Sequence, residues 1–263
     1  MNMASDYTAL DSPHILAYLF HPRKEMPGRA ARPDREDIMI PVAEGVSLGA
    51  SLHINNPGAP MLLFFHGNGE IVSDYDDLGH FFTSRAGVNF GVVDYRGYGA
   101  STGEPSVTAM MSDAHVILEF LQELMEKKKI TGPLSVMGRS LGSAPAIELA
   151  ASAPEAFHSL IIESGFALSG PLLRVLGLDP AVAGIERLKG KENLDKMAGI
   201  TCPCLVIHAE LDHLIPFSDG QALYDACPIS EKFLLEIKGA NHNDIFIHGM
   251  APYLDQVKRF CGG

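Results

Sequence analysis

The chain has 263 residues, of which 46% are hydrophobic and 20% charged, a composition that excludes wholesale disorder and fits one folded domain. Its 20 Lys and Arg residues stand against 32 Asp and Glu, and the net charge of −12 excludes a general nucleic-acid binder. No apolar run reaches the roughly 18 residues that a membrane span needs, and Met1–Asp6 lack the features of a secretory signal.

The first residues differ in pattern from the rest of the chain. Residues 1–36 carry several prolines and scattered arginines but no regular spacing of apolar residues. We therefore expect an N-terminal extension over residues 1–36 that packs on the core, followed by a single domain over residues 37–263.

Strands and helices are expected to alternate from residue 37 onward. Short apolar runs predict strands at 38–42, 46–54, 61–65, 89–94, 134–137, 160–163, 205–209 and 233–237. Helical spacing predicts helices at 107–128, 141–151, 217–226 and 247–260, with a short helical cap over 168–199. This alternation indicates parallel βαβ units, and hence an α/β fold with a mostly parallel, doubly wound sheet of about eight strands.

The motif Gly138-Arg139-Ser140-Leu141-Gly142 joins a predicted strand to a predicted helix. A G-x-S-x-G in this context is typical of a sharp turn that exposes the serine hydroxyl, with glycines where strand and helix approach closely. Ser140 is therefore a candidate nucleophile. The alternative is a serine that merely caps the helix.

Two more polar residues follow later strands. Asp212 comes shortly after the strand at 205–209, and His242 lies in a polar loop after the last strand. Ligands of such sheets bind at the carboxyl ends of the strands, so Ser140, Asp212 and His242 are expected to meet there. Their chain order of nucleophile, acid and base is that of triads on this topology, where an imidazole activates the serine and a carboxylate orients the imidazole. An Asp in this position is otherwise often a turn residue.

A glycine-rich turn, His66-Gly67-Asn68-Gly69-Glu70, follows the strand at 61–65. Such a turn supplies a backbone N–H to an oxyanion hole, together with the N–H of the residue after the nucleophile, Leu141. We assign the first donor to Asn68, with Gly69 as the alternative. His66 precedes the turn, and we expect it to hold the loop by hydrogen bonds.

Taken together, these segments resemble the α/β-hydrolase superfamily. The closest likeness is to its BEM46-like, serine-aminopeptidase-like (S33-type) branch, which includes the domain-17 depalmitoylating hydrolases. The likeness covers roughly residues 38–260, and it is carried by the segments Phe65–Gly69, Asp94–Gly103, Gly138–Gly142, Asp212–Pro216 and Gly239–His242.

The resemblance implies that Ser140, Asp212 and His242 form the triad and that Asn68 and Leu141 frame the oxyanion hole. It also implies that the segment Asp94–Gly103 is a structural turn. One departure concerns the turn after the strand at 61–65, where Gly69 and Glu70 stand in place of the branch's usual Ala and Gly. Glu70 places a carboxylate near the expected site, which would disfavour anionic substrates.

We therefore expect a serine hydrolase that cleaves a carboxylic ester or thioester of a small-molecule acyl substrate through an acyl-enzyme on Ser140. One alternative is an aminopeptidase-type amide hydrolase, in which Glu70, Glu163 or Glu210 would hold the α-amino group of the substrate. The other is a non-catalytic module that binds a small ligand with the same pocket. The sequence contains no metal-ligand cluster and no dinucleotide fingerprint, so we expect neither a metal nor a cofactor.

The apolar residues of the cap concern the acyl pocket and possible dimerisation, and the cysteines concern the cellular compartment of the protein. Apolar cap residues either line an acyl pocket or simply pack the cap onto the sheet; they are Leu168, Leu172, Leu173, Val175, Leu176, Leu178, Val182, Ile185 and Leu188. Four cysteines are too few for a disulfide framework, so we expect reduced thiols in a cytoplasmic protein. Cys261 and the apolar cap leave homodimerisation open.

Overall fold

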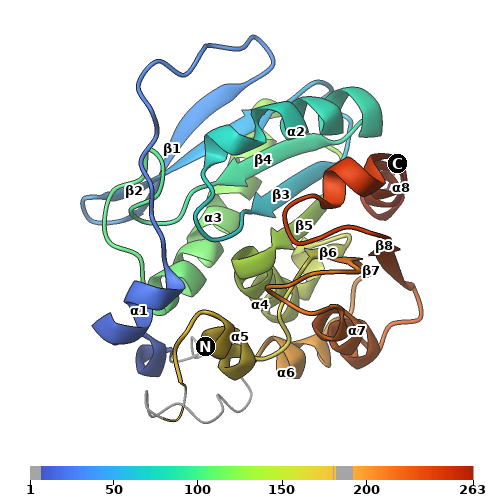
Figure 1. Cartoon of the computed structure of the whole chain (residues 1–263). Coiled ribbons are helices and arrows are strands. Elements are labelled where there is room, and N and C mark those ends of the chain that lie inside the picture. Colours follow the sequence, from blue (N-terminus) through green and yellow to red (C-terminus); the bar gives the residue numbers. More distant parts are fainter. Residues whose placement is uncertain (1–6, 180, 182–191, 263) are drawn as a thin grey trace.

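An eight-stranded sheet forms the centre of the protein in this computed structural model, which describes residues 7–179, 181 and 192–262 (Figure 1). The strands are β1 (Glu36–Ala43), β2 (Val46–His53), β3 (Met61–Phe65), β4 (Asn89–Val93), β5 (Leu134–Arg139), β6 (Leu160–Glu163), β7 (Cys204–Ala209) and β8 (Lys232–Ile237). Their order is β1-β2-β4-β3-β5-β6-β7-β8, and β2 runs antiparallel to β1 and β4 while β4, β3 and β5 to β8 run parallel. The predicted doubly wound, mostly parallel sheet is confirmed.

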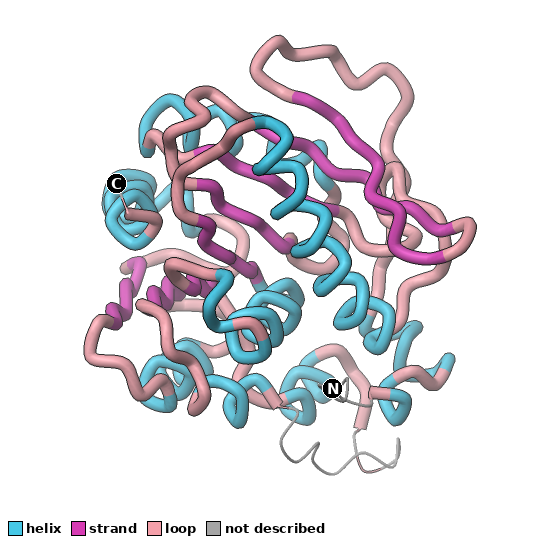
Figure 2. Tube along the Cα trace, turned by 180° about the vertical axis from the view of Figure 1, so that it is seen from behind, coloured by secondary structure: helices cyan, strands magenta, loops and turns pink. Residues whose placement is uncertain are grey.

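Helices cover both faces of the sheet. They are α1 (Pro13–Leu19), α2 (Asp76–Phe81), α3 (Val107–Lys128), α4 (Ser143–Ser152), α5 (Ser169–Val175), α6 (Asn193–Met197), α7 (Phe217–Ala226) and α8 (Ile245–Phe260). Within the described ranges, none of them combines the length and apolar character that crossing a bilayer requires. Figure 2 shows the strands from behind, enclosed between the two helical layers.

The alternation of side chains along β3 explains the two layers. Leu63 and Phe65 join the apolar cluster that contains residues of α3, α4, α6 and α7. Leu62 and Phe64 point to the opposite face and join the cluster of α8 and the turn after α2. All four side chains are at most 1% exposed, because a strand covered on both faces is apolar at every position.

Two helices were not predicted. Helix α1 lies in the extension that we expected to be irregular, where Ser12 caps the helix by accepting a hydrogen bond from the N–H of Ile15 at 3.4 Å and Pro13 begins it. Helix α2 lies between β3 and β4 and buries only Gly79. Both helices are six or seven residues long, too short for an apolar repeat to be recognised in the sequence.

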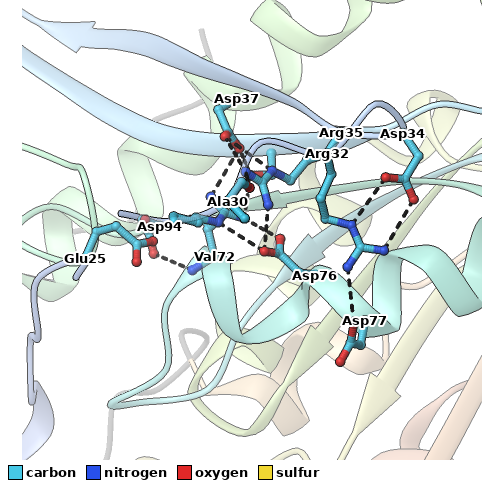
Figure 3. Close-up of polar contacts among 12 residues, drawn as sticks. Glu25, Ala30, Arg32, Asp34, Arg35, Asp37, Val72, Asp76, Asp77 and Asp94 are labelled. Carbon is cyan, nitrogen blue, oxygen red and sulfur yellow. Dashed lines mark hydrogen bonds and ion pairs between the residues drawn. The ribbon is translucent and has the colours of Figure 1, made fainter. Parts of the chain in front are cut away.

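The segment before β1 is held by ion pairs around two arginines (Figure 3). Arg35, with a side chain only 3% exposed, binds Asp76 at 2.7 Å and Asp37 at 3.0 Å, and donates to the carbonyl of Ala30 at 2.9 Å. Arg29 also contacts Asp76 and Asp37. These contacts fasten the segment to β1 and to the start of α2.

Glu148 on α4 joins the N-terminal segment to the core. Its Oε2 accepts a hydrogen bond from the hydroxyl of Tyr7 at 2.9 Å and pairs with Lys196 of α6 at 2.7 Å. Burial disfavours the carboxylate, but its hydrogen bonds with His115, Lys196 and Tyr7 and the charge of Lys196 together lower the pKa of Glu148 from 4.5 to about 2. Glu148 therefore stabilises the fold in its ionised form.

We expect Glu148→Gln to remove a pH-dependent part of the stability. Because the folded-state pKa is depressed, this contribution is full above the ordinary value of 4.5 and is lost as the pH falls toward 2. The shift corresponds to about 3 kcal/mol, which partial solvent access reduces to about 2 kcal/mol. Urea unfolding of both proteins at several pH values measures the difference, which should shrink toward acid pH. Glu123→Gln, at an exposed ion pair of α3, is the control, and a difference independent of pH would contradict the expectation.

Candidate active site

Ser140 occupies a strained turn between β5 and α4. Its φ of +51° lies in the left-handed region that residues with side chains rarely adopt. A Cβ at Gly138 would stand 2.1 Å from the carbonyl oxygen of Gly142, and one at Gly142 would stand 2.1 Å from that of Phe65. Strand, turn and helix thus pack too closely for any residue but glycine at the two ends of the motif. The turn exposes the serine at the start of the helix, as the motif predicts.

The structure brings Ser140, Asp212 and His242 together at the carboxyl ends of β5, β7 and β8. The Oγ of Ser140 lies 3.1 Å from Nε2 of His242, and Nδ1 of His242 lies 2.7 Å from Oδ2 of Asp212. His242 is 4% exposed and Asp212 is 8% exposed. Both distances permit hydrogen bonds, so the imidazole can accept the serine proton while its other nitrogen donates to the carboxylate.

The surroundings of Asp212 keep it ionised and fixed. Burial raises the pKa of this carboxyl, but the hydrogen bond and charge of His242 and the N–H of Ile215 outweigh it, so the pKa lies below its usual value. Its Oδ1 accepts hydrogen bonds from the N–H groups of Leu214 and Ile215 at 3.0 and 2.8 Å. These bonds leave Oδ2 directed at the imidazole.

A second histidine supports the loop after β7. His208 is fully buried, and desolvation lowers its pKa, so the ring is neutral at pH 7. Its Nε2 donates a hydrogen bond to the carbonyl of Ile215 at 2.9 Å. This contact holds the turn whose N–H groups bind Asp212.

Asn68 and Leu141, the predicted oxyanion donors, line the pocket that contains Ser140. The Asn68 side chain is held by the hydroxyl of Tyr98 at 2.7 Å and by the backbone N–H of His21 at 2.9 Å. These contacts fix the turn that carries both candidate donors, the N–H groups of Asn68 and Gly69.

His66 and the segment Asp94–Gly103 support the same turn from behind. His66 is fully buried and donates from Nδ1 to the carbonyl of Gly67 at 2.8 Å, while its own carbonyl accepts from the Tyr95 hydroxyl at 2.7 Å. Asp94 accepts from the N–H of Val72 at 2.9 Å. These contacts are structural, as expected.

The pocket at Ser140 has a volume of about 200 Å³ and one apolar side. Its apolar residues are Leu19, Leu141, Leu172, Val175, Leu176, Leu214 and Ile215. Of the cap residues expected here, Leu172, Val175 and Leu176 line the pocket, whereas Leu173 and Leu178 are buried in the core. Val182, Ile185 and Leu188 lie outside the described residues.

Several residues of this pocket, among them Leu19, His21 and Arg139, were not identified from the sequence as part of it. Leu19 and His21 come from the N-terminal extension, which carries no motif that would have placed them. Arg139, next to Ser140, also lines the pocket. A charged residue at the buried end of a strand was a signal for it, because such a residue requires buried partners. In the described ranges, no three His, Cys, Asp or Glu side chains converge as metal ligands.

The chain is similar in sequence to a protein family and to curated proteins. Residues 57–191 match the family described as serine aminopeptidase, S33. The α/β hydrolase domain-containing protein 17C of Mus musculus is 33% identical over 208 residues, which are 76% of this chain. This chain spans 58% of the length of that relative.

Solved structures share the fold at low sequence identity. The esterase Pf2001 of Pyrococcus furiosus superposes with a TM-score of 0.71 at 17% identity, over 91% of this chain and 97% of the esterase. Est1E from Butyrivibrio proteoclasticus, solved with ferulic acid bound, superposes with a TM-score of 0.70 at 20% identity, over 85% of this chain and 97% of Est1E. The fold, the matched family and the relative together show that the chain belongs to the serine aminopeptidase S33 family of α/β hydrolases, in the BEM46-like branch.

Proposed function

We propose that this hydrolase cleaves a carboxylic ester or thioester of a small-molecule acyl substrate through an acyl-enzyme on Ser140. The observation that carries the proposal is the hydrogen-bonded row from Ser140 through His242 to Asp212, with distances of 3.1 and 2.7 Å, beside an apolar pocket. A serine hydroxyl is a poor nucleophile at pH 7 unless a base removes its proton during attack. Here Nε2 of His242 lies within hydrogen-bond distance of the Ser140 hydroxyl.

In the first half of the reaction, Oγ of Ser140 attacks the carbonyl carbon as Nε2 of His242 takes the hydroxyl proton. The carbonyl oxygen gains the negative charge and accepts hydrogen bonds from the N–H groups of Asn68 and Leu141. The tetrahedral intermediate then collapses, and the imidazolium returns its proton to the departing alcohol or thiol. Ser140 is left acylated.

In the second half, water replaces the serine as nucleophile. His242 takes a proton from the water as its oxygen attacks the acyl-enzyme carbonyl, and returns that proton to Oγ of Ser140 as the acid leaves. Asp212, ionised because its pKa is depressed, holds the imidazole in the productive tautomer and balances its positive charge in each half.

The shape and lining of the pocket favour an apolar acyl group of short to medium length. Leu172, Val175 and Leu176 of the cap and Leu19 of the extension provide an apolar wall beside the nucleophile. A further cavity of about 30 Å³ lies behind Leu141, which lines both spaces. About 200 Å³ at the nucleophile suits a small chain better than a long lipid tail.

The carboxylates that would serve an aminopeptidase already have partners. Glu70 and Glu163 both pair with Arg139. Glu210 accepts from the N–H of Gly239 at 2.8 Å and pairs with Lys238 at 3.3 Å. Binding a substrate ammonium would require breaking one of these pairs, which supports esters over aminoacyl substrates.

The test uses p-nitrophenyl esters from acetyl to palmitoyl, aminoacyl p-nitroanilides and a fluorophosphonate probe. We expect labelling at Ser140, identified by mass spectrometry of the labelled peptide, and the highest kcat/KM for a short or medium acyl chain. Labelling with turnover of aminoacyl substrates alone would move the assignment to the aminopeptidase alternative. An unlabelled Ser140 and no turnover of any substrate would favour the binding module.

A further inference from the structure

Arg139 is the centre of a buried polar network beside the nucleophile. Its Nε donates to Glu163 at 3.0 Å, and its Nη1 pairs with Glu70. Its Nη2 donates both to the backbone carbonyl of His242 at 2.8 Å and to the Oδ1 of Asn243 at 3.0 Å. One guanidinium group therefore contacts β6, the turn after β3 and the loop that carries the catalytic histidine.

The two carboxylates extend the network to further elements. The Oε2 of Glu70 accepts from the N–H of Gly67 at 2.6 Å and from the hydroxyl of Tyr75 at 2.5 Å. The Oε2 of Glu163 accepts from the hydroxyl of Tyr253 on α8 at 2.6 Å. Each carboxylate oxygen thus has a donor, and Glu70 holds the turn that presents the oxyanion N–H.

Arg139 is the single cation of this network and pairs with both carboxylates. Although burial opposes its charge, Glu70, Tyr75 and Glu163 hold the pKa of Arg139 above its usual value, so it remains a cation. Its side chain is 11% exposed, and four of its five N–H donors face the partners described above. It is therefore poorly placed to recruit an anionic substrate, although it lines the pocket.

We propose that Arg139 is a positioning residue. It holds the loop that carries His242 and the turn that carries the oxyanion donor at fixed positions relative to Ser140, its neighbour in the chain. The inference rests on the proposed hydrolase function. The planar guanidinium suits this task because its N–H groups point in fixed directions and reach several acceptors at once. Lysine offers a single charged centre that cannot reach the same acceptors in the same geometry.

Arg35 provides a matched control. Its side chain is also buried and also binds two carboxylates and a backbone carbonyl, but it joins the segment before β1 to α2 (Figure 3). Arg35→Gln and Arg139→Gln both break a buried arginine network. Only the second change touches the loops around Ser140.

The experiment measures kcat and KM with p-nitrophenyl butyrate, the rate of fluorophosphonate labelling at Ser140, and the Tm of each protein. We expect Arg139→Gln to lower kcat and the labelling rate about 10²-fold with KM changed less than about twofold, since a misplacement of about 1 Å costs this much in rate. Arg139→Lys should recover only part of the loss. Arg35→Gln should lower Tm and leave the kcat of the folded protein within about twofold of wild type.

Chemical rescue separates positioning from general destabilisation. Millimolar guanidinium should restore a large part of the kcat of Arg139→Ala, whereas urea, a neutral molecule of similar shape, should not. Glu70→Gln keeps the size of the side chain and an acceptor for Gly67, and it provides a milder variant in case Arg139→Gln does not fold. We expect it to lower kcat about tenfold without raising KM.

The outcomes distinguish this inference from the proposed function. A wild-type Ser140 that is not labelled would overturn both. A labelled wild type together with Arg139 and Glu70 variants that keep their kcat would overturn only the positioning role. Variants that raise KM at constant kcat would instead make Arg139 a substrate-binding residue.

Discussion

Ser140→Ala is expected to lower kcat/KM for the best p-nitrophenyl ester by about 10³-fold or more, since no other group replaces the attacking oxygen. His242 and Asp212 would remain in place, because the substitution removes only the hydroxyl at 3.1 Å from Nε2. The variant should therefore keep its Tm and its affinity for the product acid. Initial rates and burst amplitudes of both proteins measure the effect.

Ser152→Ala is the matched control, since Ser152 lies at the end of α4, the helix that follows Ser140, and donates a hydrogen bond to the carbonyl of Glu148. Its turnover should equal that of wild type. Ester turnover that survives in Ser140→Ala to within about tenfold of wild type would place the nucleophile elsewhere and contradict the acyl-enzyme mechanism.

Asp212→Asn is expected to lower kcat about 10⁴-fold by imposing the wrong histidine tautomer. The N–H groups of Leu214 and Ile215 bind one oxygen of Asp212 and would select the amide oxygen of the asparagine. The amide NH₂ would then face Nδ1 of His242, which could only accept. The ring proton would move to Nε2, where it faces Ser140 and prevents the ring from acting as a base.

Single-turnover kinetics and the Tm of the variant test this expectation. Asp225→Asn on α7, where the carboxylate binds only a nearby glutamine side chain among the contacts described, is the control and should behave as wild type. A loss of less than about tenfold in Asp212→Asn would mean that the carboxylate does not set the tautomer.

Most of the sheet was predictable because its strands carry local signals. The run at 61–65 is apolar throughout and the run at 160–163 is apolar up to Glu163, and they coincide with β3 and β6. The helix at 107–128 coincides with α3, whose apolar residues recur at helical spacing over 22 residues. Helices α1 and α2 were missed because six or seven residues are too few for such a period, and their positions depend on tertiary contacts.

The convergence of Ser140, Asp212 and His242 was also predictable. Each follows a different strand, and the carboxyl ends of parallel strands meet at one edge of the sheet whatever the details of packing. The way the Asn68 side chain is fixed was not predictable, because its partner, the hydroxyl of Tyr98, lies thirty residues away in the chain.

By itself, the sequence determined three features. They are the alternation of strands and helices along the chain, the turn at Ser140, and the edge of the sheet where the polar residues lie. These features follow from local geometry: the period of apolar residues, the need for glycine at a close approach, and the direction of parallel strands. Only the tertiary structure decided that Leu19 and His21 of the N-terminal segment form part of the pocket. It also decided that Arg139 pairs with both Glu70 and Glu163. Such contacts join residues far apart in the chain, and a charge at the buried end of a strand shows that it needs partners without showing which ones it finds.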